Sequence, residues 1–499
     1  MSEAVTATGG LRSWPATDVG RVRDHNEDSF LVDKKLNLYI VADGMGGHAA
    51  GEVASSMASR TVRDAIAAER DALLEFEQGH GGTTRKDLLR LLEASVQQAC
   101  STVHNEGVKD ESKRGMGTTL DAFLVIGSRG FIAHVGDARI YLYRQGSVHQ
   151  LTEDHSLINE LLKRGRLTRE QIDKVQYKNA VTRAVGVYES VEVDVFDFDV
   201  LPGDRFLLCS DGLHGYLEES ELPRLFEEIP ETELTKHLID LANERGGKDN
   251  ITAIVVRVPD DESGVDKLSR EVNLKLDILH KMPLFRFVTY QELVRVLNIT
   301  DVRAYKPGAT VVSEGDDGDE LFVVLTGRVK VHSGETSLVE LGPGQHFGEM
   351  ALIDKAPRSA SVTAVVDSRL LAIRRRDFFD MIRKDHDVAV KLLWSFLGVL
   401  AKRLRTTSHE LGQAREMLAA EDMTHEIAGE ATKPRAPAGD KSPISEMLEI
   451  IEKKLPTEPP PPDSVTLEME RPTIADLDDE PRFDDEEIDV DDDTESDPS

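Results

Sequence analysis

Three predicted β-strands each meet an aspartate at one end, and this pattern limits what the chain can fold into and do. The three junctions are Leu38–Ala42 with Asp43, Phe206–Ser210 with Asp211, and Asp249 with the strand that starts at Ile251. Asp-Gly and Asp-Asn are ordinary turn dipeptides, so each aspartate taken alone is most simply a loop residue. A hairpin does not account for Asp43 and Asp211, because helical patterns rather than partner strands follow both of them.

Carboxylates at strand ends beside glycines suit a hard divalent cation. Magnesium and manganese prefer a few oxygen ligands and keep some of their waters. Gly44 and Gly212 directly follow two of the aspartates, and glycine lets a backbone carbonyl approach closely. The residues alone therefore predict a magnesium or manganese site at the ends of these strands.

Size, charge and cysteine content exclude several classes of protein. A chain of 499 residues predicts two or three domains. The formal net charge of -32 would repel a phosphate backbone, so no nucleic-acid partner is expected. Only two cysteines are present, which rules out a disulfide framework and favours a reducing compartment. Since neither a leader segment nor a long apolar run is found, we expect a cytoplasmic protein with no membrane partner.

The composition changes along the chain and divides it into four parts. Residues 11–258 mix short apolar strands with amphipathic helices, which predicts one α+β domain, and 259–282 is a linker that ends in an amphipathic connector. Residues 283–405 show short strands punctuated by glycines, the pattern of a small barrel with helices. Residues 406–499 are predicted to be a helix extension and a disordered, proline-rich acidic tail, because 476–499 contains 14 acidic residues and one arginine.

Six ordered motifs in the first part resemble those of the PPM-type, or type 2C, metal-dependent protein serine/threonine phosphatases, particularly their bacterial branch. They are Arg23 with Asn26-Glu27-Asp28, Val41-Ala42-Asp43-Gly44-Met45-Gly46-Gly47-His48, Gly115-Met116-Gly117-Thr118-Thr119, Gly136-Asp137-Ala138-Arg139, Ser210-Asp211-Gly212-Leu213 and Asp249-Asn250-Ile251-Thr252. The resemblance implies a sandwich of two β-sheets flanked by helices. It also implies hydrolysis of phosphoserine and phosphothreonine on proteins, including those modified by a Ser/Thr kinase, by a metal-activated water.

The resemblance also implies a metal set of two Mn²⁺ or Mg²⁺ ions. Asp43 would bridge both ions, and Asp211 and Asp249 would complete the shell of one. Glu27 and the carbonyl oxygen of Gly44 would serve the other.

Further roles are implied for residues around this set. Arg23 would hold the substrate phosphate, and Asp137, with Asp211, would help bind a third ion, although Asp137 also fits a turn between two strands. Met45 stands where eukaryotic relatives have a histidine proposed as general acid, so the leaving-group acid is unassigned. For His48, a structural role at the start of a helix is favoured over a role as the general acid. The insert from 154 to 179, predicted to be helical, resembles the flap of the family, which is expected to contact the substrate protein.

The second part carries a glycine-led short helix, 342–353, followed by the lone Arg358, a pattern that predicts an anion site. Glu349 beside it could accept hydrogen bonds from a sugar hydroxyl. This stretch resembles the phosphate-binding cassette of cyclic-nucleotide-binding domains. The resemblance implies that Arg358 binds the cyclic phosphate and Glu349 the ribose, and that further contacts come from Gly348, Met350, Ala351 and Ser359.

The serine at position 359 favours cyclic AMP over cyclic GMP as the ligand, and a barrel kept only as a scaffold is the alternative. The apolar helix after Asp377 resembles the lid and dimer helix of such domains, which implies a homodimer; packing against the barrel is the other interpretation. The sequence thus predicts a phosphatase regulated by a cyclic nucleotide. A catalytically dead nucleotide-gated adaptor is the alternative, and a transcription factor is disfavoured because no basic recognition helix follows.

Overall fold

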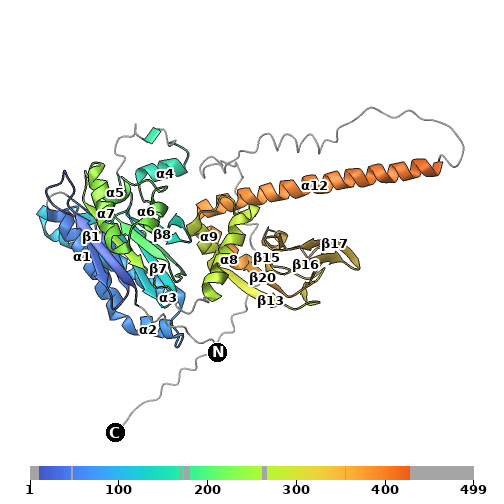
Figure 1. Ribbon diagram of the computed structural model, residues 1–499, viewed down its shortest axis with the longest axis horizontal. Coiled ribbons are helices and arrows are strands. Elements are labelled where there is room, and N and C mark those ends of the chain that lie inside the picture. Colours follow the sequence, from blue (N-terminus) through green and yellow to red (C-terminus); the bar gives the residue numbers. More distant parts are fainter. Residues whose placement is uncertain are drawn as a thin grey trace, which may run out of the picture.

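The structure is a computed structural model, and it forms two β-rich units with a long helix beside them (Figure 1). It describes residues 10–46, 49–167, 171–172, 180–260, 267–353 and 356–426. The predicted helix extension is present, since α12 runs from His386 to Glu426. The predicted disordered tail lies outside the described residues from residue 427 onwards.

The first unit is a sandwich of two antiparallel five-stranded sheets. One sheet has the order β1-β12-β11-β8-β9, with bounds Arg12–Asp18, Ile251–Arg257, Arg205–Cys209, Arg139–Arg144 and Ser147–Gln150. The other has the order β10-β7-β6-β3-β2, with bounds Asp194–Asp199, Arg129–Val135, Leu120–Ile126, Leu38–Ala42 and Ser29–Asp33. The inner faces meet through aromatic side chains, with the rings of Phe123 and Phe206 4.5 Å apart. The predicted sandwich is confirmed.

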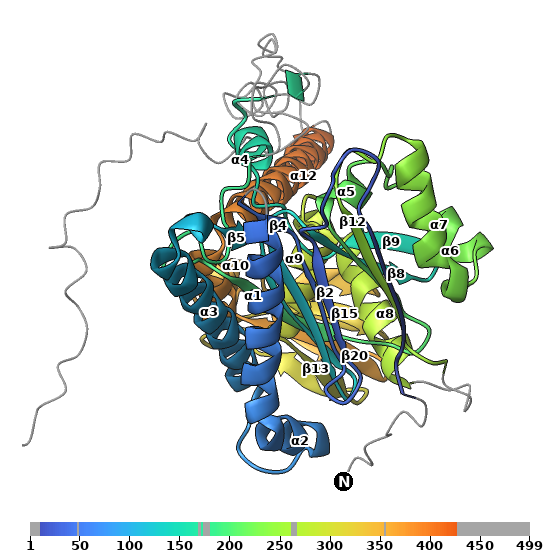
Figure 2. The ribbon, with the colours of Figure 1, turned by 90° about the vertical axis from the view of Figure 1, so that its left-hand side faces the viewer.

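Helices cover both outer faces of the sandwich (Figure 2). On the β3 side lie α1 (Ala49–Ala68), α2 (Arg70–Gln78) and α3 (Arg85–Lys109), with η1 (Glu111–Lys113) after them. On the β12 side lie α5 (Asp211–His214), α6 (Leu222–Glu228) and α7 (Glu231–Glu244). A small pair, β4 (Gly44–Met45) with β5 (Gly117–Thr118), follows the end of β3.

The insert between β9 and β10 is less helical than predicted. Within its described residues the only α-helix is α4 (Leu157–Lys163), where the Ser156 hydroxyl accepts a hydrogen bond from the Asn159 amide and caps the start. The backbone leaves the helix after Lys163, where Arg164 and Gly165 form a turn and Gly165 has a positive φ of 61°. The prediction of one helix over 154–179 was therefore wrong for 154–156 and 164–167, and 168–170 and 173–179 lie outside the described residues.

The second unit is a small barrel of two four-stranded antiparallel sheets, as predicted. Their orders are β13-β20-β15-β18 and β14-β19-β16-β17. The strands are β13 (Thr300–Tyr305), β14 (Thr310–Val312), β15 (Glu320–Thr326), β16 (Val329–Ser333), β17 (Thr336–Leu341), β18 (His346–Phe347), β19 (Ser361–Ala364) and β20 (Ser368–Arg374). The helices around it are α8 (Lys267–Lys281), η3 (Pro283–Phe285), α9 (Tyr290–Asn298), α10 (Met350–Ile353), α11 (Arg375–Lys384) and α12.

The two units share one apolar core, so the predicted linker is more than a spacer. Val272, Leu276 and Leu279 of α8 are buried in a cluster that also contains residues of both units. Next to this core, the buried Arg144 pairs with Asp204 and donates to the Tyr290 hydroxyl at 3.0 Å. Helix α9 is thus fixed to the sandwich by both apolar and polar contacts. No helix among the described residues is long and apolar enough to cross a membrane.

Candidate metal centre and nucleotide site

The predicted acidic residues gather where the ends of several strands meet. Asp43 follows β3, Asp211 begins α5 directly after β11, and Asp249 precedes β12 by two residues. Glu27 comes just before β2, the neighbour of β3. Since β11 pairs with β12 and β3 packs across the sandwich, the topology carries these side chains to one edge.

Glycines let the backbones meet closely at this edge. A Cβ atom on Gly44 would lie 2.5 Å from the Glu27 carbonyl oxygen, and one on Gly212 would lie 2.0 Å from the Asn250 carbonyl oxygen. The Gly44 amide donates to that Glu27 carbonyl at 3.2 Å. Any larger residue would push the acidic segments apart, which explains why glycine follows both aspartates.

The carboxylates raise one another's pKa values. Burial, together with the charges of Asp28 and Asp211, holds the pKa of Asp43 well above its usual range. Burial raises the pKa of Asp28 to about 7, and burial with the charge of Asp211 raises that of Asp137 to about 7. Burial and Asp249 also raise the pKa of Asp211. Negative charge at this edge is therefore under-compensated, and a divalent cation would stabilise it.

Several carboxylate oxygens here are buried and lack a hydrogen-bond partner, namely Glu27 Oε1, Asp28 Oδ1 and Asp211 Oδ1. An all-oxygen donor set suits Mg²⁺ or Mn²⁺, so the residues fit the metal that the sequence predicts. Within the described part of the chain, no three Asp, Glu, His or Cys side chains already enclose an ion-sized position. The remaining ligands would be waters and backbone carbonyl oxygens, which these cations commonly use.

Arg23 lies at the rim of the acidic edge. Its Nη2 donates to Asp249 Oδ2 at 2.8 Å, and about half of its side chain is exposed. The guanidinium is thus oriented by one of the predicted ligands while keeping donors free toward solvent.

Sequence reasoning gave no role to Asp28, Ser210 and Asn250, although these three residues organise this edge. Asp28 is buried and accepts a hydrogen bond from the Ser210 hydroxyl at 2.7 Å. The Asn250 side chain accepts from the Glu27 amide at 2.8 Å and donates to the His25 carbonyl at 2.9 Å. All three lie inside the motifs quoted above, next to predicted ligands, and this adjacency was the available signal.

Asp137 lies in the turn between β7 and β8, so both interpretations of this residue are compatible with its position. His214 of α5 donates from Nε2 to the Asp137 carbonyl oxygen at 2.8 Å. Burial lowers the pKa of His214 to about 4, so this histidine is neutral and positions the turn without adding charge.

The predicted nucleotide residues lie together at the edge of the barrel. Two glycines make room for the Arg358 side chain: a Cβ atom on Gly318 would lie 2.1 Å from its Nε, and one on Gly348 would lie 2.6 Å from its Nη1. Arg358 Nη2 donates to the Glu320 carbonyl oxygen at 2.9 Å, and burial lowers the pKa of Arg358. The guanidinium is therefore partly desolvated and fixed, as an anion-binding arginine requires.

Glu349 is the most buried charged residue of this group. Its side chain is 3% exposed, its Oε1 pairs with Arg403 of α12, and its Oε2 has no hydrogen-bond partner. Ala351 is buried on α10, whereas Met350 and Ser359 are exposed at the surface. An unsatisfied buried carboxylate oxygen is costly, and a hydroxyl donor from a ligand would remove that cost.

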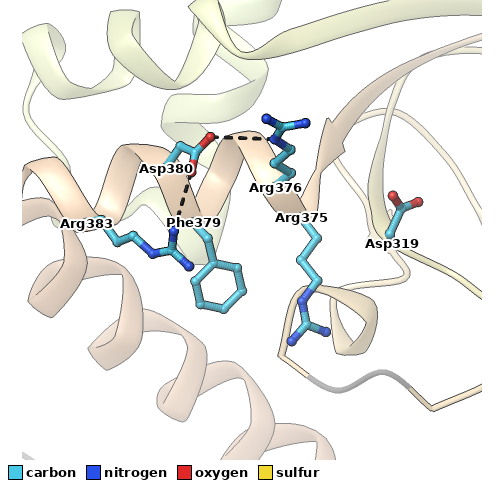
Figure 3. A pocket seen from close by; sticks show the side chains of 6 residues that line it. All are labelled: Asp319, Arg375, Arg376, Phe379, Asp380 and Arg383. Atoms are coloured by element: carbon cyan, nitrogen blue, oxygen red, sulfur yellow. Dashed lines mark ion pairs between the residues drawn. The ribbon is translucent and has the colours of Figure 1, made fainter. Parts of the chain in front are cut away.

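A separate open cleft lies beside α11 (Figure 3). It is lined by Asp319, Arg375, Arg376, Phe379, Asp380 and Arg383. Asp380 pairs with both Arg376 and Arg383, so much of the positive charge is already balanced. None of the predicted metal or nucleotide residues lines this cleft.

Comparisons with known proteins agree with the identity of both predicted domains. The family described as "Protein phosphatase 2C" matches residues 21–249, and "Cyclic nucleotide-binding domain" matches 302–385. The serine/threonine phosphatase stp of Listeria innocua is 40% identical over 244 residues, which cover 48% of this chain and 93% of that protein. Protein phosphatase PhpP of Streptococcus pneumoniae is 38% identical over 253 residues, 50% of this chain and 97% of that protein.

Two solved structures are similar to about half of this chain. The catalytic domain of the phosphatase PstP in complex with two manganese ions is 36% identical, covers 50% of this chain and 99% of that chain, and has a TM-score of 0.43. Stp1 from Staphylococcus aureus is 28% identical, covers 52% and 99%, and has a TM-score of 0.45.

The fold and the sequence relatives define a metal-dependent protein serine/threonine phosphatase. The chain belongs to the bacterial branch of the protein phosphatase 2C family, and it carries a cyclic-nucleotide-binding domain behind its phosphatase domain.

We expect Mn²⁺ binding to weaken as the pH falls from 8 to 6. The pKa values of Asp28 and Asp137 are each raised to about 7, so both are largely ionised at pH 8 and largely protonated at pH 6. A cation needs the ionised form, so each group that loses its proton on binding contributes a loss of affinity of about tenfold over this range. Calorimetric titration of EDTA-treated, dialysed protein with MnCl₂ at both pH values measures the change. Equal affinities, with no proton release in buffers of different ionisation enthalpy, would contradict the expectation.

Proposed function

We propose that the cluster of Glu27, Asp43, Asp211 and Asp249 holds the two cations with which this phosphatase hydrolyses phosphoserine and phosphothreonine on proteins. Two observations carry the proposal: Glu27 and Asp211 each have a buried carboxylate oxygen without a hydrogen-bond partner, and burial with neighbouring negative charges raises the pKa values of Asp43 and Asp211. Such a cluster is unfavourable without a cation and favourable with one.

We assign a role in holding the cations to each of these residues. Asp43, whose pKa is raised by burial and by the charges of Asp28 and Asp211, would contribute to both cation sites, and the Gly44 carbonyl oxygen with Glu27 would contribute to one of them. Asp211 and Asp249 would contribute to the other. Bound cations would supply a water of lowered pKa close to the phosphorus atom.

Arg23 binds the phosphoryl oxygens of the substrate. Its hydrogen bond to Asp249 orients the guanidinium, and its exposed donors match the geometry of a phosphate group. Met45, the residue after the Asp-Gly pair, carries no transferable proton, so the leaving-group acid stays unassigned, and His48 lies outside the described residues. Asp137 with Asp211 is the pair to which a third ion would bind, which the effect of Asp211 on the pKa of Asp137 supports.

The insert that contains α4 is proposed to contact the protein part of the substrate. Its end is joined to the catalytic unit by an antiparallel bridge between Val185 and Thr118, whose hydroxyl donates to the Asp43 carbonyl oxygen at 2.9 Å. A protein substrate, including a target of a Ser/Thr kinase, would therefore meet the insert as its phosphate reaches Arg23.

Asp43→Asn or Asp211→Asn should reduce Mn²⁺-dependent hydrolysis of p-nitrophenyl phosphate and of a phosphothreonine peptide by about 100-fold or more, because each removes a charged ligand. EDTA should abolish the activity of the wild-type protein. Asp240→Asn, an exposed substitution on α7, is the matched control. Activity within twofold of wild type in the Asp43 variant would refute the metal assignment, and thermal unfolding without metal checks that each variant is folded.

We further propose that the barrel binds a cyclic nucleotide that regulates hydrolysis, with Arg358 on the cyclic phosphate and Glu349 on the ribose. Gly348, Met350, Ala351 and Ser359 supply backbone and hydroxyl contacts. The free Oε2 of Glu349 and the space that two glycines leave around Arg358 support this proposal. The serine at 359 favours cyclic AMP over cyclic GMP.

Arg358→Ala should weaken cyclic AMP binding by about tenfold or more, the effect of losing hydrogen bonds to a charged group. If cyclic AMP changes the phosphatase rate of the wild-type protein, the same concentration of cyclic AMP should leave the rate of Arg358→Ala unchanged. Arg376→Ala, an exposed substitution on α11, is the control. Tight binding by the wild-type protein with unchanged rates on several phosphoproteins would make the barrel a localisation or dimerisation module.

We propose that α12 pairs two copies of the chain. Leu393, Leu397, Leu404 and Leu411 are 51% to 56% exposed on this helix, and the last three recur every seven residues. This is the spacing of a coiled-coil seam. Glu410 and Arg415 flank the seam at positions that face each other across a parallel pair, so opposite charges would meet.

Leu404→Glu with Leu411→Glu should convert the dimer to a monomer, because charges in the seam cannot be buried. Light scattering after gel filtration should show a change from twice the chain mass of 55.3 kDa to that mass. Lys402→Glu, exposed on the same helix outside the seam, should stay dimeric. A wild-type protein that is monomeric at micromolar concentration would refute the proposal.

A further inference from the structure

Helix α12 contacts the phosphatase insert at its first turn. Asp387 pairs with Lys163, the last residue of α4, at 3.1 Å, and Lys163 also pairs with Glu153 at 2.8 Å. Both main views show α4 next to this end of α12 (Figures 1 and 2). A residue of the nucleotide-binding unit is therefore part of the anchorage of the insert.

The same helix contacts the nucleotide site farther along. Arg403 reaches from α12 to Glu349 Oε1, the carboxylate proposed to bind ribose. The other oxygen of Glu349 has no partner, and His346 Nε2 nearby is also buried without one. Arg403 is half exposed, so it can leave Glu349 for water at little cost, whereas Glu349 cannot.

Between these two contacts α12 is a continuous helix fixed against the rest of the molecule. Asp387 and Arg403 are sixteen residues apart, or about 24 Å along a helix. Val388, Leu392 and Phe396 are buried in the core that both units share, and Lys391 pairs with Glu292 of α9 at 2.7 Å.

Helix α9, which supports α12, is itself held against two strands of the phosphatase unit. Its Tyr290 ring stacks on His149 of β9 with centroids 3.8 Å apart, and the Asn298 side chain accepts from Arg129 of β7 at 3.1 Å. Helix α12 thus runs from the insert to the nucleotide site and packs against a helix that the catalytic unit holds in place.

We propose that Arg403 holds the ribose-binding carboxylate of Glu349 until a cyclic nucleotide displaces it, and that α12 carries this exchange to the substrate insert through the Asp387–Lys163 pair. The inference rests on the proposed function, because it needs both the nucleotide site and the role of the insert.

The exchange has two consequences for binding. A ribose hydroxyl must compete with a charged guanidinium, so Arg403 lowers the affinity for the nucleotide. Because linkage is reciprocal, a phosphoprotein that engages the insert should shift the affinity for the nucleotide by the factor with which the nucleotide shifts affinity for that phosphoprotein. A small ester such as p-nitrophenyl phosphate has no protein part to contact the insert, so its hydrolysis should not report the exchange.

The first experiment tests the competition at Glu349. Calorimetry on the full chain with Mn²⁺ measures cyclic AMP and cyclic GMP binding to wild type, Arg403→Gln and the matched control Lys402→Gln. Arg403→Gln should bind the nucleotide at least about fivefold more tightly, within the usual range of coupling, and the control should equal wild type. An unchanged or weaker affinity in Arg403→Gln, or binding of neither nucleotide to wild type, would overturn the proposal.

The second experiment tests transmission to the insert. Steady-state rates on a phosphothreonine protein and on p-nitrophenyl phosphate are measured with and without cyclic AMP. In wild type the nucleotide should change KM for the phosphoprotein by about fivefold or more. In Asp387→Asn that KM should respond by less than twofold, while calorimetry still detects nucleotide binding; Asp387→Glu and the control Glu416→Gln, an exposed substitution on α12, should respond as wild type does.

A wild-type response in Asp387→Asn would overturn the proposed route. If the wild-type chain did not hydrolyse p-nitrophenyl phosphate with Mn²⁺, the proposed phosphatase function itself would be refuted. The two failures are therefore distinguishable.

Discussion

Mutual repulsion among buried carboxylates is the constraint on which the phosphatase unit depends. Asp28, Asp43, Asp137 and Asp211 lie where two sheets meet, and their pKa values are all raised. Without a cation, part of this charge is removed by protonation rather than by pairing. The fold therefore keeps at its edge a group of like charges that opposes folding. The large apolar core between the sheets supplies the stability that this arrangement removes.

The joining of the two units follows from a similar balance. Arg144 is a buried cation. Its burial is tolerated because Asp204 neutralises its charge and the Tyr290 hydroxyl accepts a hydrogen bond from its guanidinium. That acceptor comes from α9, so the catalytic unit completes its hydrogen bonding only when the nucleotide-binding unit is docked. Apolar residues of α8 close the same interface. The molecule consequently behaves as one body here, in contrast to two domains on a flexible connector.

The sequence predicted features that depend on local pattern and missed those that depend on distant contacts. Leu38–Ala42 was recognisable as a strand because its residues are continuously apolar, and Leu120–Ile126 because all but Asp121 are apolar; both strands are buried on both faces. The glycine-flanked aspartates were recognisable as a cluster by their repetition. The Arg403–Glu349 pair joins residues 54 positions apart through tertiary packing, and no local pattern records it. The insert was overpredicted as helix because helical propensity is a weak guide where few tertiary contacts support it.

The position of Arg403 beside Leu404 has a consequence for the dose–response. In a parallel pair of α12 helices with two-fold symmetry, the two Arg403 side chains flank one shared seam. If the proposed pairing of α12 holds, a nucleotide that draws Arg403 of one chain away from Glu349 would alter the seam on which the second chain also depends. The two nucleotide sites would then not be independent, and the occupancy curve would depart from a simple hyperbola. The shape of that curve would therefore report on the pairing of two copies.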